Sequence, residues 1–216
     1  MGNEDLLYIE DDKKRKLFYR FTPAALVSNF VPLIVILDEN ATHFEYKMWN
    51  VLTPLDHFGY ENKGSCWLGG KGDFFVKDLL QELIQQIAEE YECEDHIYLY
   101  GSAMGGYGAI LHGILCGANA VYAHAPRIRL QKTSDGDTLI KEKENDLTHF
   151  LNATDPFPVF YLCENENDPE DETAYFADAC KKHDIKVHLD FCPKSEDETQ
   201  VIKEVLGFFE RMASEG

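Results

Sequence analysis

Two glycines frame the segment of this sequence that comes nearest to a catalytic pattern. Gly101 and Gly105 stand two positions before and two positions after Ala103, between an apolar run at 96–100 and a small-residue helix expected at 104–115. Residues without bulk at these positions allow a sharp strand-to-helix turn that holds the central residue in a strained conformation at its tip. Such a tip suits a nucleophile that attacks a carbonyl carbon. Here the central residue is alanine, and a methyl group cannot attack.

The stretch Gly-Ser-Ala-Met-Gly at 101–105 resembles the nucleophile elbow, Gly-x-Ser-x-Gly, of the α/β hydrolases. The resemblance covers residues 31 to 212 and implies that Ala103 has the nucleophile position, with Ser102 and Met104 beside it at the pocket and oxyanion site. A glycine-rich turn of another doubly wound fold is the alternative. The longer run Gly-Ser-Ala-Met-Gly-Gly-Tyr-Gly-Ala is also similar to a bacterial subgroup associated with surface-glycan and capsule synthesis. That similarity implies O-acyl groups on sugars as the ancestral substrate.

The resemblance further implies an acid and then a histidine, each after a later strand. Asp168 follows the strand expected at 159–163 and matches the acid, but because Pro169 comes next it is equally suited to cap a helix. No histidine follows the last expected strand, and Glu198 stands in its place. With Ser195 three residues earlier, Glu198 also fits a capping box, which would make it a helix-start residue only.

Acidic residues also follow the buried strand expected at 31–37. Hydrolases carry a His-Gly type of loop there, whose N–H groups help to hold the oxyanion, whereas this chain has Asp38, Glu39 and Asn40. Carboxylates there would oppose a developing negative charge. Trp67 is expected either to line the pocket or to anchor its glycine-rich loop. A metal-dependent enzyme is a further alternative, but a solvated acidic rim is favoured, so no metal and no cofactor is expected. The carboxylates in question are Asp38, Glu39, Glu164, Glu166 and Asp168.

Short apolar runs alternate with amphipathic helices along the chain. This order predicts a single α/β domain over 1–216, α/β-hydrolase-like, with a mostly parallel central sheet and helices on both faces. The stretch 131–156 has no strand pattern and is expected to be a short lid insertion with one charged helix at 139–150. Strands are expected at 6–9 and 17–21, as an opening antiparallel pair, and at 31–37, 49–52, 96–100, 120–123, 159–163 and 187–191. Helices are expected at 75–91, 104–115, 169–182 and 201–212.

The composition excludes several classes of partner. The formal net charge of −19 argues against nucleic acid and against an anionic membrane surface, and no segment is apolar enough to insert into a membrane. The six cysteines are widely spaced, and without a signal-peptide pattern they are expected to be buried reduced thiols rather than disulfides. A cytoplasmic protein with a small-molecule or glycan-type ligand is therefore expected.

Two functions compete for this chain. The first is a non-catalytic pseudo-hydrolase that keeps the fold for binding or regulation. The second is an active serine esterase, O-acyl hydrolase or transferase present as a Ser→Ala variant, and it requires a histidine that the sequence does not provide after the last strand. An engineered change explains the loss at Ala103, but a natural loss of catalysis explains Ala103, Glu198 and the 38–40 loop together. The sequence therefore favours the pseudo-hydrolase.

Overall fold

The centre of the protein is an eight-stranded sheet with the strand order β1-β2-β4-β3-β5-β6-β7-β8. The computed structural model describes residues 6–25, 31–38, 44, 46–56, 67–69, 73–130, 143–151, 156–164, 171–189, 191–195 and 197–215. The strands are β1 (Leu7–Glu10), β2 (Lys16–Thr22), β3 (Leu33–Leu37), β4 (Asn50–Leu55), β5 (Ile97–Ser102), β6 (Ala120–His124), β7 (Val159–Cys163) and β8 (Val187–His188).

The sheet is parallel from β4 to β8, and β1 and β2 form the predicted opening antiparallel pair. All five residues of β3 are buried, as expected of a parallel strand that is covered on both faces. β8 is shorter than predicted, since only Val187 and His188 pair with β7. The predicted mostly parallel α/β sheet is confirmed.

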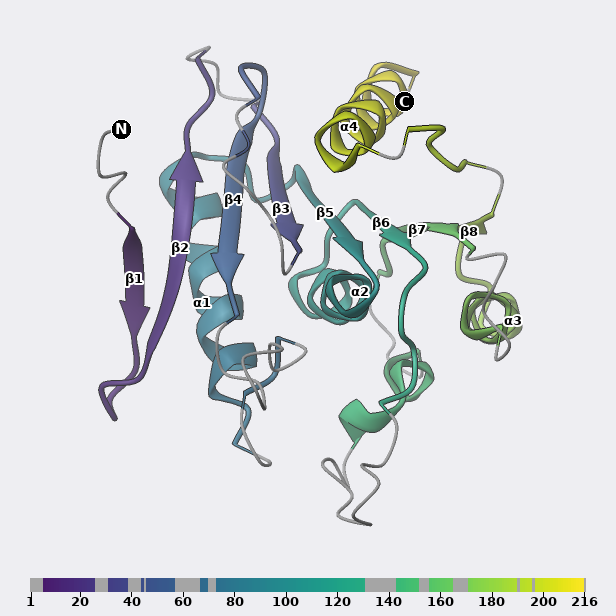
Figure 1. Cartoon of the computed structure of the whole chain (residues 1–216), viewed down its shortest axis with the longest axis horizontal. Coiled ribbons are helices and arrows are strands. Elements are labelled where there is room, and N and C mark those ends of the chain that lie inside the picture. The colour runs from purple at the N-terminus through teal and green to yellow at the C-terminus, as the bar shows by residue number, and fades with distance from the viewer. Residues whose placement is uncertain are drawn as a thin grey trace.

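Helices cover both faces of the sheet (Figure 1). One face packs against α1 (Phe75–Glu90), α2 (Met104–Cys116) and α3 (Glu172–Lys182), and the other face packs against α4 (Glu198–Glu215). The apolar spacing in the sequence explains this arrangement, because α1 and α4 each bury one stripe of large side chains. Among the described residues, no helix combines the length and the apolar character needed to cross a membrane.

The described part of the predicted lid packs against the core. Instead of one charged helix, residues 143–150 form two short 3-10 turns, η2 (Lys143–Asn145) and η3 (Leu147–Phe150). Leu147 is fully buried, and the Tyr107 hydroxyl of α2 donates a hydrogen bond to the backbone oxygen of Glu144. The Glu144 carboxylate pairs with Lys77 of α1 at 2.7 Å. Residues 131–142 and 152–155 lie outside the described part of the chain, so the lid stays a prediction.

A disulfide joins Cys163 to Cys192, with a Cα–Cα distance of 5.2 Å. The prediction that all cysteines are reduced thiols is therefore wrong for this pair. The two residues are 29 positions apart, and only the fold brings the end of β7 beside the segment that precedes α4. Cys93 and Cys180 are buried free thiols as predicted, Cys116 is a free thiol that is half-buried, and Cys66 lies outside the described residues. The predicted cytoplasmic location rested partly on reduced thiols, and it stays a prediction.

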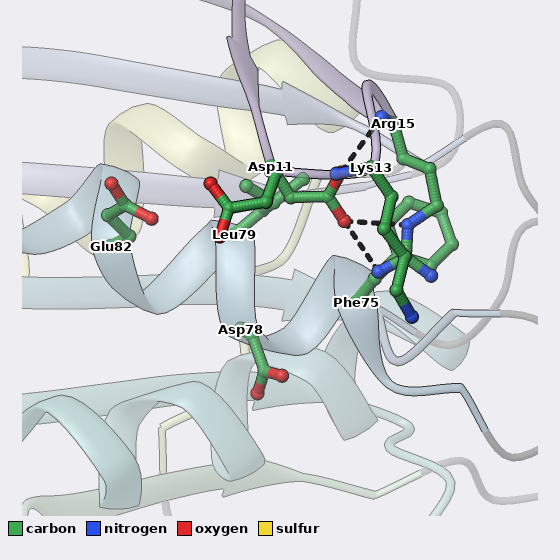
Figure 2. Close-up of a pocket in the computed structure, with 8 residues that line it drawn as sticks. Asp11, Lys13, Arg15, Phe75, Asp78, Leu79 and Glu82 are labelled. Atoms are coloured by element: carbon green, nitrogen blue, oxygen red, sulfur yellow. Dashed lines mark hydrogen bonds and ion pairs between the residues drawn. The ribbon is translucent and has the colours of Figure 1, made fainter.

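A pocket of about 240 Å³ lies between the β1–β2 turn and the start of α1 (Figure 2). Among the described residues that line it, the cations Lys13 and Arg15 face four carboxylates, and the Arg15 guanidinium is held by Asp11 and Asp73. Because the Arg15 guanidinium of the turn pairs with Asp73 and lies over the Phe75 ring of α1, the pocket has the character of a turn anchored on a helix. It is lined by Asp11, Asp12, Lys13, Arg15, Phe75, Asp78, Leu79 and Glu82.

Candidate functional site

Ala103 occupies the tip of a strained turn between β5 and α2. Its side chain is exposed and its backbone has φ 49° and ψ −111°, so the strained conformation predicted for this residue is confirmed. A Cβ atom on Gly101 would collide with the backbone of Gly105, and a Cβ on Gly105 would collide with the backbone oxygen of Leu37. The turn can therefore close only with glycine at both positions. The Ala103 N–H donates to the His124 oxygen at 2.9 Å, which fixes the turn to β6.

Parallel strands bring several polar residues to the same edge as Ala103. Ser102 ends β5, is half-buried, and lies in register with His124 at the end of β6, which in turn lies in register with Cys163. Met104 is the first residue of α2 and is also half-buried. Burial lowers the pKa of His124, so its imidazole is neutral at pH 7. His124 was not predicted as a site residue, although its place at the end of the strand beside β5 was the available signal.

Asp38 and Glu198 form a hydrogen-bonded carboxyl pair at this edge. Asp38 follows β3 and is 7% exposed, and Glu198 is the first residue of α4. The hydrogen bond to Asp38 raises the pKa of Glu198 to about 8, with burial and the negative charges of Asp38 and Asp197 acting in the same direction. Two carboxyl groups so close together share a proton at neutral pH. One oxygen of the pair therefore donates a hydrogen bond while the others accept.

The capping-box interpretation of Glu198 is wrong. The Asp197 carboxylate, not the Ser195 hydroxyl, accepts the N–H of Gln200 at 3.0 Å and so caps α4. Ser195 accepts the N–H of Asp197 at 3.1 Å. The Glu198 side chain has no role in that cap and is turned to Asp38.

The start of α3 also differs from the prediction. The helix begins at Glu172, and the Asp171 carboxylate caps it by accepting the N–H of Ala174 at 3.2 Å. The N-cap interpretation of Asp168 is therefore wrong, since the helix starts four residues later. Asp168 itself, like Glu39, lies outside the described residues.

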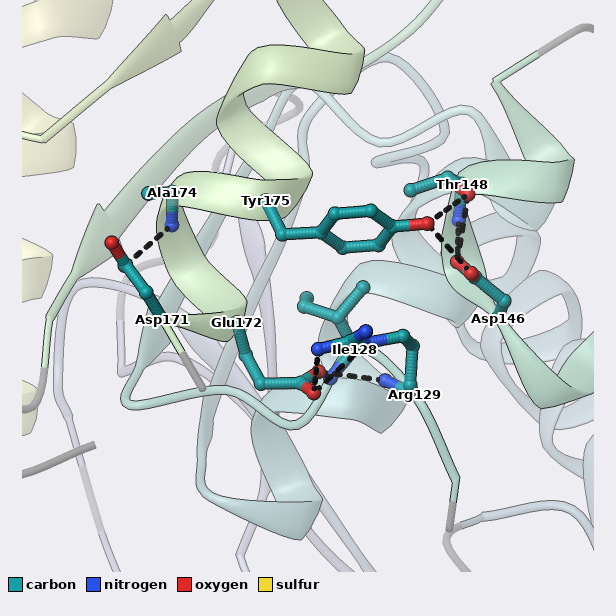
Figure 3. A network of polar contacts seen from close by, with 8 residues as sticks. All are labelled: Ile128, Arg129, Asp146, Thr148, Asp171, Glu172, Ala174 and Tyr175. Atoms are coloured by element: carbon teal, nitrogen blue, oxygen red, sulfur yellow. Dashed lines mark hydrogen bonds and ion pairs between the residues drawn. The ribbon is translucent and has the colours of Figure 1, made fainter. Parts of the chain in front are cut away.

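A buried carboxylate anchors this helix start beside the site (Figure 3). Glu172 is 1% exposed and accepts the backbone N–H groups of Ile128 and Arg129, both at 2.8 Å. The Arg129 guanidinium pairs with the same carboxylate at 3.0 Å. The segment after β6 and the segment that enters α3 are thereby fixed to each other.

Solved structures resemble this architecture over nearly the whole chain, whereas no family model matches the chain and no curated protein matches its sequence. An S-formylglutathione hydrolase from Agrobacterium tumefaciens has a TM-score of 0.71 and 14% identity, covering 97% of this chain and 94% of that chain. Esterase 2 of Thermogutta terrifontis has a TM-score of 0.68 and 15% sequence identity, and the match covers 100% of this chain and 95% of that chain. A capsule O-acetyltransferase of Neisseria meningitidis serogroup A, in complex with CoA, has a TM-score of 0.68 and 15% sequence identity. The match covers 98% of this chain and 96% of that chain.

The chain has the α/β-hydrolase fold. Within this α/β-hydrolase fold, Trp67 belongs to the core and not to a ligand-exposed surface. Its indole is 1% exposed and lies against α2 at Gly108, where a Cβ would collide with the ring. The buried His112 bonds to the Trp67 oxygen at 3.1 Å and to Gln81 at 2.7 Å, and burial lowers the pKa of His112 to about 4. Of the two predicted roles, the structure shows the loop anchor.

The metal alternative has no support in the described part of this α/β-hydrolase fold. No three His, Cys, Asp or Glu side chains gather there in a way that could hold a metal ion. Three of the carboxylates that the sequence offered for it lie outside the described residues, namely Glu39, Glu166 and Asp168.

Proposed function

We propose that this protein is a non-catalytic member of the α/β-hydrolase fold that binds a ligand above Ala103. The observation that carries the proposal is the exposed methyl group of Ala103 at the tip of an otherwise intact elbow. By the resemblance, this is the nucleophile position, and acyl transfer needs a hydroxyl there. The elbow itself remains a scaffold that exposes one small side chain at the sheet edge.

The carboxyl pair supports the same proposal. Glu198 stands where the resemblance expects histidine, and Asp38 stands where it expects the donors of an oxyanion hole. A pair that shares one proton is a poor base for a hydroxyl group and opposes a nearby oxyanion. The resemblance also implies that Asp168 has the position of the triad acid, which cannot act without the histidine that it would orient.

We propose a neutral, hydroxyl-bearing ligand of the glycan type. The one proton of the Asp38–Glu198 pair lies between the two carboxyl groups, so the pair offers acceptor oxygens to a ligand, and sugar hydroxyls can donate to them. One structural neighbour is a capsule O-acetyltransferase, which is the reason to test O-acetylated glycans. That neighbour was solved with CoA, but a net charge of −19 disfavours a polyanion of that kind here. No cofactor is proposed.

The test is titration of the protein with neutral oligosaccharides, both free and O-acetylated, with CoA as a comparison. Binding is measured by NMR or calorimetry. Binding of a neutral glycan without turnover is expected, and Glu198→Ala should weaken it about tenfold because a polar contact is lost. Glu94→Ala, an exposed change on another part of the surface, is the matched control and should bind normally. If neither form of any glycan binds, the ligand class is wrong.

The second candidate is an esterase or O-acyl transferase carried as a Ser→Ala variant. The strained backbone at Ala103 favours this candidate. Such strain is typical of active sites, and an ordinary turn would not need it. Short activated acyl esters separate the two candidates. No measurable hydrolysis is expected, and rapid turnover that survives rigorous purification would overturn the non-catalytic proposal.

A further inference from the structure

The disulfide joins the two segments on which the site depends. Cys163 is the last residue of β7, and its backbone oxygen accepts the N–H of Ala125 at 2.8 Å, so it belongs to the rigid sheet. Cys192 lies between β8 and α4, six positions before Glu198. The bond therefore ties the segment that leads to the Asp38–Glu198 pair to the edge that carries Ala103.

The segment 191–195 has few other attachments. No backbone–backbone hydrogen bond joins it to another residue in the part of the chain that the structure describes. The Phe191 ring stacks on Phe208 at 4.3 Å and meets Tyr122 at 5.8 Å. The Lys194 N–H donates to the Glu204 carboxylate at 3.4 Å, which is a long bond on the surface. Apart from these contacts and the Ser195–Asp197 hydrogen bond, the covalent link is what holds this segment to the end of β7.

The two sulfur atoms differ in access, and this difference directs the chemistry. Cys192 is exposed, whereas Cys163 is 5% exposed. The free thiols of Cys93, Cys116 and Cys180 are held inert, since burial raises the pKa of Cys93 to about 11 and those of Cys116 and Cys180 to about 12. Among the described cysteines, thiol–disulfide exchange is thus directed to the Cys192 sulfur.

We propose that Cys163–Cys192 is a reversible redox-modification site that an external dithiol opens in the folded protein. Reduction releases the segment 191–195 and with it the placement of Glu198 against Asp38. The consequence for ligand binding rests on the proposed function, but the redox chemistry does not. In the oxidised protein the α4 side of the site is fixed, and in the reduced protein it is free to move.

The exchange balances in two steps. A thiolate of the dithiol attacks Sγ of Cys192, the more exposed residue of the pair, breaks the Cys163–Cys192 bond and expels the Cys163 thiolate, which takes a proton from water. The second thiol of the reductant, as a thiolate, then attacks the reductant's sulfur in the mixed disulfide. This step releases the Cys192 thiolate, which is protonated in turn, and the reductant leaves as a disulfide. Two electrons pass from the dithiol to the cysteine pair.

The experiment equilibrates the native full chain in buffers of reduced and oxidised dithiothreitol. Free thiols are trapped with an alkylating reagent, and labelled peptides are assigned by mass spectrometry. Cys163 and Cys192 should become labelled together while the protein stays folded, and Cys93 and Cys180 should stay unlabelled. Hydrogen exchange of the Gln200 and Val201 amides, which Asp197 accepts at the start of α4, should accelerate at least about tenfold on reduction.

Two variants sharpen the test. Cys163→Ser combined with Cys192→Ser should give fast exchange at Gln200 and Val201 in both buffers, whereas Cys116→Ser should keep the wild-type redox response. Should the double variant fail to fold, the thiol trapping on the natural chain still decides. The proposal is overturned if the disulfide opens only when the protein unfolds, if both thiols are free in the oxidised buffer, or if exchange at Gln200 and Val201 does not change on reduction. A redox response without glycan binding would overturn the proposed function alone.

Discussion

Ala103 differs from serine by one oxygen atom, and the surroundings of that atom decide what restoring it would achieve. A serine hydroxyl is a weak nucleophile until a histidine takes its proton. In the described part of the site, the group nearest to that role is Glu198, whose carboxyl shares its proton with Asp38. An Ala103→Ser variant would therefore present a hydroxyl without an effective base.

We expect Ala103→Ser alone to give no efficient esterase. Combined with Glu198→His it should exceed either single variant by at least about a hundredfold in kcat/KM, since a positioned general base contributes on that scale and groups of one triad are not additive. The measurement is hydrolysis of an activated acetyl ester by both singles and the double variant. High activity from Ala103→Ser alone would show that the base lies elsewhere and that the alanine replaced a working serine.

The raised pKa of Glu198 makes stability depend on pH. Its ordinary value is 4.5 and its value in the folded protein is about 8. Between these values the unfolded chain has lost the proton and the folded protein has kept it, so stability falls as pH rises from about 4.5 to about 8. Glu198→Gln removes this titration. At pH 8 the variant should be more stable than the natural chain by roughly 1–2 kcal/mol, a figure discounted for solvent screening.

Urea unfolding at pH 5 and pH 8 checks the prediction, with the exposed change Glu94→Gln as the control. The difference between Glu198→Gln and the natural chain should be small at pH 5 and should grow with pH. A difference that is constant across this range would mean that Glu198 does not share a proton with Asp38 in solution.

Part of the site could be predicted at the residue scale, and part could not. Glu198 and Asp38 could be assigned to the edge of Ala103, because parallel strands end together. Their hydrogen bond was not predictable, since Ser195 and Glu198 have capping-box spacing and only the fold shows that Asp197 is the cap. The N-cap of α3 was likewise not predictable: Asp168 had the sequence pattern of a cap, but Asp171, three residues later, is the actual cap.

At the scale of elements, the junction of α3 with the segment after β6 depends on Glu172. Glu172→Ala should destabilise the protein by about 2–4 kcal/mol, because it leaves the N–H groups of Ile128 and Arg129 without their acceptor. Glu172→Gln keeps an acceptor oxygen and should cost about half as much. Urea unfolding measures both.

The control for this junction is Asp178→Asn, on the exposed face of the same helix. Asp178 pairs with Lys181 at 3.4 Å with both side chains in solvent, so its loss should change stability by less than about 0.5 kcal/mol. Equal losses for Glu172→Ala and Asp178→Asn would contradict the structural role of the buried carboxylate.

Elements with strong periodicity could be predicted, and those with weak patterns could not. The apolar run of β3 and the stripes of α1 and α4 leave little choice, because only a buried strand or an amphipathic helix hides them. The stretch 143–150 has one apolar side chain per turn at most, so its pattern does not define its conformation, and its charged residues were interpreted as part of a helix. Tertiary contacts of Glu144 and Leu147 decide its conformation instead.

At the scale of the whole molecule, the net charge of −19 destabilises the compact state through self-repulsion. Raising the salt concentration from about 0.01 M to about 0.15 M shortens the Debye length from roughly 30 Å to roughly 8 Å. We expect Tm at pH 7.5 to rise by roughly 3–6 °C over this change, which corresponds to about 1–2 kcal/mol for a chain of this size.

Thermal unfolding at both salt concentrations tests this expectation. The same comparison at pH 4.7, close to the sequence pI, is the control, and the effect of salt should shrink there. A Tm at pH 7.5 that stays constant or falls with salt would show that ion pairs, and not repulsion, dominate the surface.

The disulfide is the whole-molecule feature that lay beyond prediction from the sequence. Spacing alone could not pair Cys163 with Cys192, because their approach depends on the positions of β7 and of the segment before α4. By contrast, the parallel sheet and the overall fold class followed from the alternation of apolar runs and helices.

The packing of Gly101 and Gly105 has a consequence for the history of such proteins. These glycines let β5, α2 and the end of β3 approach one another, so they remain necessary for folding whatever residue stands between them. Selection for catalysis can therefore be relaxed at position 103 while selection for the fold retains the frame around it. Descendants that have lost activity would keep the glycine spacing and vary at its centre. A pattern search that demands serine would pass over such lineages, and one that demands only the glycines would find them.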